Sequence, residues 1–274
     1  MRFTDVHTHS AFSADGKSPL GEMLARARQL GAAYYGVSDH FDYDYLADGV
    51  LAQGKPVPMI DAPAYFAEAR RLQAAYAGEM RVLVGGEFGF TATPAAQRMY
   101  ADVIATFRPD FVVNSVHTVD GADVWFPASF AGKARNGAYR AYLEKVRESL
   151  DAPYAYDIVA HLGYISRNAP YADNLLRYTD FPDLLDDILR TIIARGSILE
   201  VNGSARGAGD FLPGRDILER YFALGGRSVS YGSDAHAASA VGQNREKAVR
   251  ALKDIGFAGV TVPDGGAHIL VPFD

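Results

Sequence analysis

The sequence predicts an α/β fold in which a parallel sheet is covered by helices and closes into a barrel. Short apolar runs typical of buried strands recur seven times, and the stretches between them have the periodicity and end signals of helices. Regular alternation of strand and helix is typical of a parallel sheet with helices on its faces. The turn after the first run, HTHSAFSADG, lacks the Gly-x-Gly-x-x-Gly pattern of an open dinucleotide-binding sheet, which favours the barrel.

The expected strands are short and buried on both faces. They are RFTDVH, AYYGVSDH, RVLVGGEF, DFVVNSVH, YDIVAHLG, GSILEVNG and RSVSYGSDAH. The first helix is expected to begin with Ser18 as its N-cap and Pro19 at the first helical position, and to end before Gly31. A second helical pattern begins at Asp61 and ends at Gly78, and two later patterns end at Gly196 and Gly256.

We expect one barrel domain over residues 1–274, because no linker or repeat divides the chain. Residues 41–60 do not fit the strand–helix repeat and are expected to be an insertion loop after the second strand. Residues 257–274 are expected to be a terminal extension that forms a hairpin.

Composition narrows the function classes. The 274 residues are 49% hydrophobic and 22% charged, which is typical of a globular protein. A net charge of −6 gives no electrostatic reason to expect long nucleic acid as a partner, and no apolar run is long enough for a membrane span. The first residues lack the features of a signal peptide, so the cytoplasm is the expected location. The sequence does not define an oligomeric state.

The histidines are concentrated at one kind of position. Six of the seven follow directly on predicted strands, namely His7, His9, His40, His117, His161 and His236. His7 and His9 share one strand face, because successive side chains alternate, and two such imidazoles can bind one metal ion. The carboxyl ends of barrel strands converge on a single face, where barrel enzymes place their active sites. The remaining histidine, His268, is expected to be structural.

Three carboxylates accumulate at the same edge. They are Asp15, Glu87 and Asp234. Each of the nine residues alone has a structural alternative, such as a helix cap or a buried ion pair, but their convergence favours a metal site. The chain has no cysteine, so any ligands must be His, Asp or Glu. Nine ligands exceed the needs of one zinc ion, and they therefore predict two or three divalent ions, Zn, Mn or Fe, with hydrolytic chemistry.

In chain order these motifs resemble the PHP (polymerase and histidinol phosphatase) superfamily. The motifs are His-x-His, Asp-Gly, Ser-Asp-His, Gly-Gly-Glu, Ser-Val-His, a lone His after the fifth strand and Gly-Ser-Asp-Ala-His, between residue 5 and about residue 236. The resemblance implies a distorted (β/α)7 barrel with up to three divalent ions at the C-terminal ends of the strands.

The resemblance also implies a distribution of ligands. A first ion would be bound by His7, His9, Glu87 and Asp234. Glu87 would bridge to a second ion, which His117 and His161 complete. Asp15, His40 and His236 would hold the third.

Within the superfamily the chain is most similar to stand-alone histidinol-phosphate phosphatases. The resemblance implies a phosphomonoesterase for L-histidinol phosphate, a small-molecule phosphate ester of histidine biosynthesis. Arg167 and Arg206, on loops after the fifth and sixth strands, are placed to bind the substrate phosphate, for which guanidinium is suited. Asp234 and His236 are the candidate catalytic groups for proton transfer.

Other functions stay open at this stage. The segment after His40, FDYDYLADG, departs from the loop expected in that family, and Asp42, Asp44 and Asp48 are either turn residues or partners of a cationic amine, with turn residues favoured. Alternatives are a PHP phosphoesterase for a nucleotide bisphosphate, a cyclic phosphate or a DNA-end phosphate, and a non-catalytic metal-binding module. An amidohydrolase-like enzyme is disfavoured, because the fourth strand ends in Ser-Val-His and not in a lysine.

Overall fold

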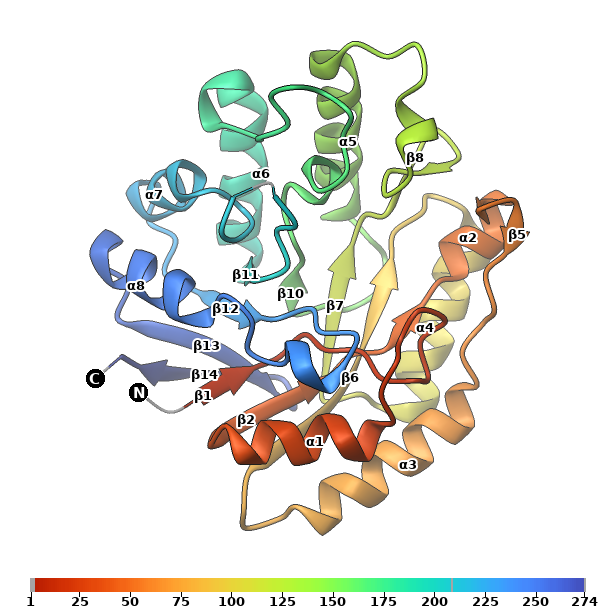
Figure 1. Cartoon of the computed structure of the whole chain (residues 1–274), viewed down its shortest axis with the longest axis vertical. Helices are drawn as coiled ribbons and strands as arrows, with labels where there is room; N and C mark the ends of the chain where they lie inside the picture. The colour runs from red at the N-terminus through yellow and green to blue at the C-terminus, as the bar shows by residue number, and fades with distance from the viewer. Residues whose placement is uncertain (1–2, 208, 274) are drawn as a thin grey trace.

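Seven parallel strands form a nearly closed barrel at the centre of the molecule (Figure 1). The structure, a computed structural model, describes residues 3–207 and 209–273. The barrel strands, in spatial order, are β1 (Phe3–Asp5), β2 (Ala32–Val37), β6 (Arg81–Gly89), β7 (Phe111–Ser115), β10 (Ile158–Val159), β11 (Ile198–Asn202) and β12 (Val229–Gly232). The circle is completed where Val6 N donates to Tyr231 O at 3.1 Å and Thr8 pairs in parallel with Ala235. The predicted fold class, a distorted (β/α)7 barrel, is confirmed.

The barrel is distorted at the end of its second strand. Residues 34–37 of β2 pair with residues 81–84 of β6. The pairing is then interrupted at residues 38 and 39, and β3 (His40–Phe41) resumes it with Glu87 and Phe88 of β6. This second pairing places His40 directly beside Glu87.

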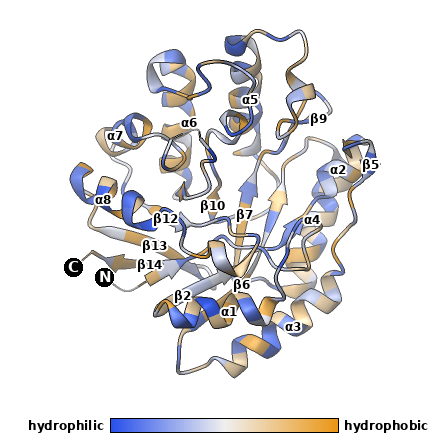
Figure 2. Ribbon diagram, viewed as in Figure 1, coloured by the Kyte–Doolittle hydropathy of each residue, from blue (hydrophilic) through white to orange (hydrophobic). Residues whose placement is uncertain are grey.

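Helices surround the strands (Figure 1). They are α1 (Leu20–Gln29), α3 (Ala62–Ala75), α4 (Pro94–Phe107), α5 (Arg135–Ser149), α6 (Pro182–Arg195), α7 (Arg215–Ala223) and α8 (Arg245–Ile255). Apolar and polar residues alternate along them in Figure 2, as expected for helices with one face against a sheet. Among the described residues, no helix is both long and apolar enough to cross a membrane.

Most helix ends follow the sequence signals, with one correction. Asp61 Oδ1 accepts a hydrogen bond from Ala64 N at 3.0 Å at the start of α3, as an N-cap should. The expectation that Ser18 caps α1 is wrong, because Pro19 is the cap residue. The Ser18 hydroxyl instead accepts from Ala238 N at 3.1 Å, so a tertiary contact uses the oxygen that a cap would need.

Two glycines make room for an aromatic ring inside the barrel. A Cβ atom on Gly36 of β2 would lie 2.8 Å from the Phe111 ring, and one on Gly85 of β6 would lie 2.6 Å from it. Phe111 itself is buried on β7. These strands can therefore close around the ring only because both neighbours lack a side chain.

The segment 41–60 has regular structure of its own. It contains α2 (Tyr43–Asp48) and a small hairpin of β4 (Leu51–Ala52) and β5 (Lys55–Pro56). Asp48 fastens this insertion to the barrel, because its Oδ1 accepts from the hydroxyls of Thr91 and Thr93 at 2.9 and 2.8 Å. The expected hairpin at the C-terminal end is present as β13 (Gly259–Asp264) and β14 (Ala267–Pro272).

Candidate metal centre and active site

The six histidines that follow predicted strands lie together at the carboxyl ends of the barrel strands. The ring centroids of His9 and His40 are 4.1 Å apart, and those of His9 and His236 are 4.2 Å apart. On the other side of the cluster, the rings of His117 and His161 are 5.3 Å apart. Since these residues follow β1, β2, β7, β10 and β12, it is closure of the barrel that brings them together.

Glu87, near the end of β6, lies at the centre of the histidines and is 1% exposed. Its Oε2 is 3.2 Å from His7 Nε2 and 3.0 Å from His40 Nδ1. Its Oε1 is 2.9 Å from His161 Nε2 and 3.1 Å from His117 Nε2. One carboxylate thus contacts histidines from both halves of the cluster, which is the position that a bridging ligand requires.

The two other carboxylates approach the histidines from opposite sides. Asp234 Oδ1 is 3.3 Å from His9 Nε2, in the buried part of the cluster. Asp15 Oδ2 is 3.1 Å from His236 Nε2, and its Oδ1 is 3.9 Å from His40 Nε2. The Asp15 side chain is 64% exposed, so it stands at the mouth of the site.

The donor atoms fit divalent cations. Within residues 3–207 and 209–273, five buried atoms of the cluster have no hydrogen-bond partner, namely His7 Nε2, His9 Nε2, His40 Nδ1, His161 Nδ1 and Glu87 Oε2. Ligands about 2.0–2.2 Å from a shared ion stand roughly 2.9–3.5 Å from each other, which matches most of the contacts above. Buried polar atoms without partners are costly, and a shared cation would satisfy several of them at once.

In the part of the chain that the structure describes, four groups of three residues have donor atoms close enough to share an ion. They are His7, His9 and Asp234; His7, Glu87 and His161; His9, His40 and His236; and His40, Asp42 and His117. The first three groups overlap the sets expected from the sequence. Asp42 was not expected in such a group.

The electrostatics of the site keep its carboxylates ionised, and the same carboxylates outweigh burial and raise the pKa of His7, His40 and His117, so a metal ion would have to displace protons from these rings. Burial favours neutral carboxyls, but the neighbouring histidines outweigh it and hold the pKa of Glu87 well below its usual range. For Asp234, Arg167 and His9 likewise outweigh burial and lower the pKa. Burial and repulsion from two neighbouring histidines hold the pKa of His9 well below its usual range, so this ring is neutral and keeps a free lone pair. Ionised carboxylates and neutral imidazoles are the forms that bind metals.

The two candidate phosphate-binding arginines occupy different settings. Arg167 is 6% exposed, and its Nη2 donates to Asp234 Oδ2 at 2.7 Å and to Asn202 Oδ1 at 2.8 Å. Arg206 is exposed, with its guanidinium carbon 4.5 Å from the centroid of the Trp125 ring. Both arginines line the cavity above the cluster. The link between Arg167 and Asp234 was not foreseen from the sequence.

Backbone conformation is unusual at three of these positions. His161, Arg206 and Asp234 have φ angles of 23°, 47° and 53°, in the left-handed region that non-glycine residues rarely adopt. Residues in such conformations cluster at functional sites, where the surrounding structure holds them in place.

Sequence reasoning missed two buried acids that support the cluster. Glu200 accepts from His7 Nδ1 at 2.6 Å, and it lies in the otherwise apolar run GSILEVNG, where a charged residue was the available signal. Asp39 accepts hydrogen bonds from Ser10 and Ser13, in the loop that carries Asp15. Both carboxylates hold neighbours of the site and do not themselves belong to the groups above.

The site opens into a cavity of about 640 Å³. Next to the histidines, its wall carries acidic and aromatic side chains, with Asp42 and Tyr45 from the insertion and Asp123, Trp125 and Tyr164 from the barrel side. Lys17 and Lys55 also line it. Asp123 belongs to β9 (Ala122–Asp123), which pairs with β8 (Thr118–Val119). The insertion after the second strand therefore forms part of the site.

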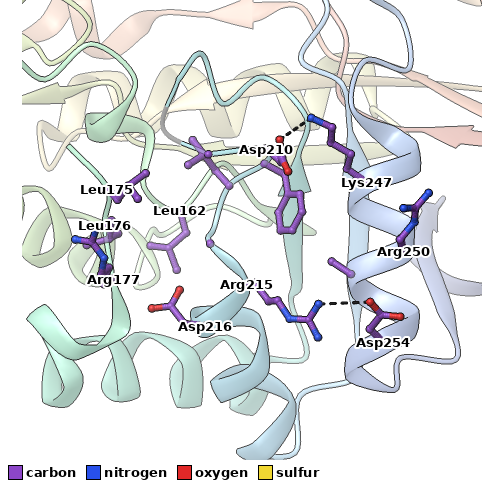
Figure 3. Close-up of a pocket in the computed structure, with 15 residues that line it drawn as sticks. Leu162, Leu175, Leu176, Arg177, Asp210, Arg215, Asp216, Lys247, Arg250 and Asp254 are labelled. Carbon is purple, nitrogen blue, oxygen red and sulfur yellow. Dashed lines mark hydrogen bonds and ion pairs between the residues drawn. The ribbon is translucent and has the colours of Figure 1, made fainter. Parts of the chain in front are cut away.

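A second cavity, of about 750 Å³, lies beside the segment 209–216 and helix α8 (Figure 3). Leu162 contributes to an apolar wall on one side. On the other side Lys247 Nζ donates to Asp210 Oδ1 at 2.6 Å. This ion pair ties α8 to the segment 209–216.

The fold and the cluster together define a barrel protein with a histidine- and carboxylate-rich centre at the carboxyl ends of its strands. The family model of the PHP domain matches residues 5–204. The chain therefore belongs to the PHP domain family.

The chain is also similar to curated and solved proteins over nearly its whole length. It is 27% identical to a histidinol-phosphatase of Lactococcus lactis subsp. lactis, covering 94% of this chain and 93% of that protein. It is 26% identical to a probable histidinol-phosphatase of Clostridium acetobutylicum, covering 90% and 91%. The solved histidinol phosphate phosphatase of Lactococcus lactis, in complex with zinc, L-histidinol and phosphate, superposes with a TM-score of 0.82 at 24% identity, covering 97% of this chain and 98% of that one. A putative histidinol phosphatase of Listeria monocytogenes gives a TM-score of 0.76 at 20% identity, covering 89% and 99%.

Proposed function

We propose that this protein is a metal-dependent phosphomonoesterase that hydrolyses L-histidinol phosphate to L-histidinol and phosphate. The observation that carries the proposal is a single cavity lined by a histidine–carboxylate cluster, by two arginines and by further acidic and aromatic side chains. The similar proteins named as histidinol-phosphatases support this substrate. Such an enzyme would act on a small-molecule ester in histidine biosynthesis, in the cytoplasm.

The cluster is proposed to hold two or three divalent ions, with zinc, manganese and iron as candidates. His7, His9, Glu87 and Asp234 would form one site, with Glu87 shared with His117 and His161. Asp15, His40 and His236 would form the third, at the mouth. When bound, the ions would activate a water for attack on phosphorus and neutralise charge on the phosphate oxygens.

The side chains around the cluster then have separate tasks. Arg167 and Arg206 would bind the equatorial oxygens of the phosphate and stabilise their charge as the bond to the leaving group breaks. Asp234 and His236 are the groups proposed to handle protons, since Asp234 Oδ1 lies 3.6 Å from His236 Nδ1 and both line the cavity.

The leaving alcohol is proposed to bind at the acidic wall. L-Histidinol carries an amine, which is cationic at neutral pH, and the carboxylates of Asp42 and Asp123 face the cavity where it would lie. Asp44 and Asp48 do not line this cavity. Asp48 is bonded to two threonines and Asp44 is fully buried, so of the three acids considered in the insertion only Asp42 is placed for the substrate.

The test is steady-state phosphate release from L-histidinol phosphate by protein supplied with Mn²⁺ or Zn²⁺, with nucleotide bisphosphates, cyclic phosphates, DNA-end phosphates and sugar phosphates in parallel. We expect kcat/KM of about 10⁴–10⁸ M⁻¹s⁻¹ for L-histidinol phosphate and much lower values for the other esters. Faster turnover of another ester would replace the substrate and keep the metal chemistry. No turnover of any ester by metal-loaded protein would favour a non-catalytic metal-binding module.

A matched pair of variants tests the acidic wall. Asp42→Asn should raise KM for L-histidinol phosphate by about tenfold while leaving hydrolysis of phenyl phosphate, whose leaving group carries no amine, unchanged, because one charged contact is worth about 1.5 kcal/mol. Asp48→Asn, at the end of the adjoining helix α2 and outside the cavity, is the control. Equal effects of Asp42→Asn on both esters would exclude recognition of the amine.

A further inference from the structure

Glu200 lies in the middle of β11 and is fully buried. Its Oε1 accepts from His7 Nδ1 at 2.6 Å. Its Oε2 accepts from the backbone N–H of His161 at 2.6 Å and from Asn202 Nδ2 at 3.0 Å. Three donors from three different strand ends therefore converge on the two oxygens of one carboxylate.

We propose that Glu200 is a positioning residue that orients the His7 ring through its Nδ1 and fixes His7 and His161 relative to each other. When His7 donates its Nδ1 proton to Glu200, the neutral ring keeps its lone pair on Nε2, the atom that faces Glu87 at 3.2 Å. The bond to the His161 backbone holds the end of β10 to the same carboxylate. The inference rests on the metal centre of the proposed function and not on its substrate.

The effect of Glu200 reaches the other side of the cluster through Asn202. These residues are two positions apart on β11, so both point to the same face of the strand. Asn202 Nδ2 is 3.3 Å from Asp234 Oδ2, and Asn202 Oδ1 accepts from Arg167 Nη2 at 2.8 Å. One continuous set of hydrogen bonds thus joins His7, through β11, to Asp234 and Arg167.

The neighbouring strand is shaped to admit this carboxylate. A Cβ atom on Gly232 of β12 would lie 2.2 Å from Glu200 Oε1 and 2.5 Å from His7 Cβ. Gly232 is not among the glycines with a positive φ, so backbone conformation does not require glycine there. The missing side chain instead provides the space in which Glu200 reaches His7.

Glutamine cannot replace Glu200 in this arrangement. A carboxylate accepts from all three donors, whereas the carboxamide has one acceptor oxygen and an NH₂ group that only donates. In Glu200→Gln, the NH₂ group takes the place of one of the two carboxylate oxygens. In the first case it faces the His161 N–H and the Asn202 side chain, and in the second case it faces the His7 ring. In the second case His7 must accept at Nδ1 and carry its proton on Nε2, where it blocks metal binding.

The experiment measures metal affinity in the absence of substrate, by competition with a chromogenic chelator for Zn²⁺ and Mn²⁺. Glu200→Gln should bind metal about 10- to 100-fold more weakly than the wild type, the range usual for loss of a partner behind a metal-binding histidine. Its turnover should recover as Mn²⁺ is raised, which a merely structural defect would not permit. Gly232→Ala keeps Glu200 but places a methyl group where its carboxylate lies, so it should also weaken metal affinity. This variant replaces Glu200→Gln in the experiment if Glu200→Gln does not fold.

Asp157→Asn is the matched control, because the Asp157 carboxylate accepts from Val112 N at 2.9 Å at the opposite end of the strands. It should change thermal stability and leave metal affinity unchanged. Metal affinity within twofold of wild type in folded Glu200→Gln would overturn the inference. If wild-type protein binds metal but hydrolyses no ester, the proposed function fails while this test of Glu200 still stands.

Discussion

Exchange of Arg167 for lysine should separate two tasks of this side chain. Its Nη2 alone holds Asp234 at 2.7 Å and Asn202 at 2.8 Å, and the residue lines the cavity. Lysine has a single charged nitrogen, so it cannot keep the Asp234 contact and also bind a phosphate with parallel hydrogen bonds. A charged hydrogen bond contributes about 1.5–3 kcal/mol, and loss of one therefore lowers kcat/KM by about 10- to 150-fold.

The assay is phosphate release from L-histidinol phosphate, with metal content measured on the same samples. In Arg167→Lys we expect the loss in kcat/KM with metal content near that of the wild type. In Arg167→Ala the buried Asp234 loses its partner, which should also lower the unfolding free energy by about 3–5 kcal/mol in the metal-free protein. Arg206→Lys, at an exposed site, is the control and should leave stability unchanged. Activity of Arg167→Lys within threefold of the wild type would refute the reasoning.

Three further results are expected. His9→Ala removes a proposed metal ligand and should reduce turnover at least 100-fold, as measured by phosphate release, while circular dichroism shows a folded protein. Chelation should abolish activity and lower the thermal midpoint in calorimetry, because ligand at 100 times its Kd adds about 2.7 kcal/mol to the stability of the native state. Asp44→Asn should stabilise the protein increasingly as pH rises. Burial raises the pKa of Asp44 to about 7, so ionisation of this carboxyl lowers the free energy of unfolding. The loss of stability is absent near pH 4, grows as the pH rises and reaches at most about 4 kcal/mol above pH 7.

Each of these results has a control. For His9→Ala it is His268→Ala, outside the cluster, and equal activity of the two variants would contradict the ligand role. After chelation, Zn²⁺ or Mn²⁺ should restore activity, whereas Mg²⁺ as the only effective ion would argue against a histidine-rich centre. For Asp44→Asn the control is Asp48→Asn in the same helix, and a stability difference that does not vary between pH 5 and pH 8 would contradict the pKa argument.

Much of the candidate site could be predicted from the sequence, because most of its residues come directly after a predicted strand. A residue that directly follows a buried strand lies at the carboxyl edge of the barrel wherever that strand is in the sequence, so His7, His117 and Asp234 were placed on one face by local pattern alone. The same apolar runs and their spacing predicted the barrel. Local hydrophobic periodicity and the convergence of parallel strands are sufficient for both conclusions.

Other features depend on contacts between distant segments. Ser18 fits the pattern of a helix cap, yet its hydroxyl bonds to Ala238, 220 positions away. Asp42 and Asp48 are similar acids in one short segment, and only packing against the barrel turned one to the cavity and the other to two threonines. Glu200 and His7 are 193 positions apart. The sequence by itself determined which residues reach the carboxyl edge, because strand position is a local property. The tertiary structure decided which of them touch and which acid supports which histidine, because those contacts form only when the barrel closes.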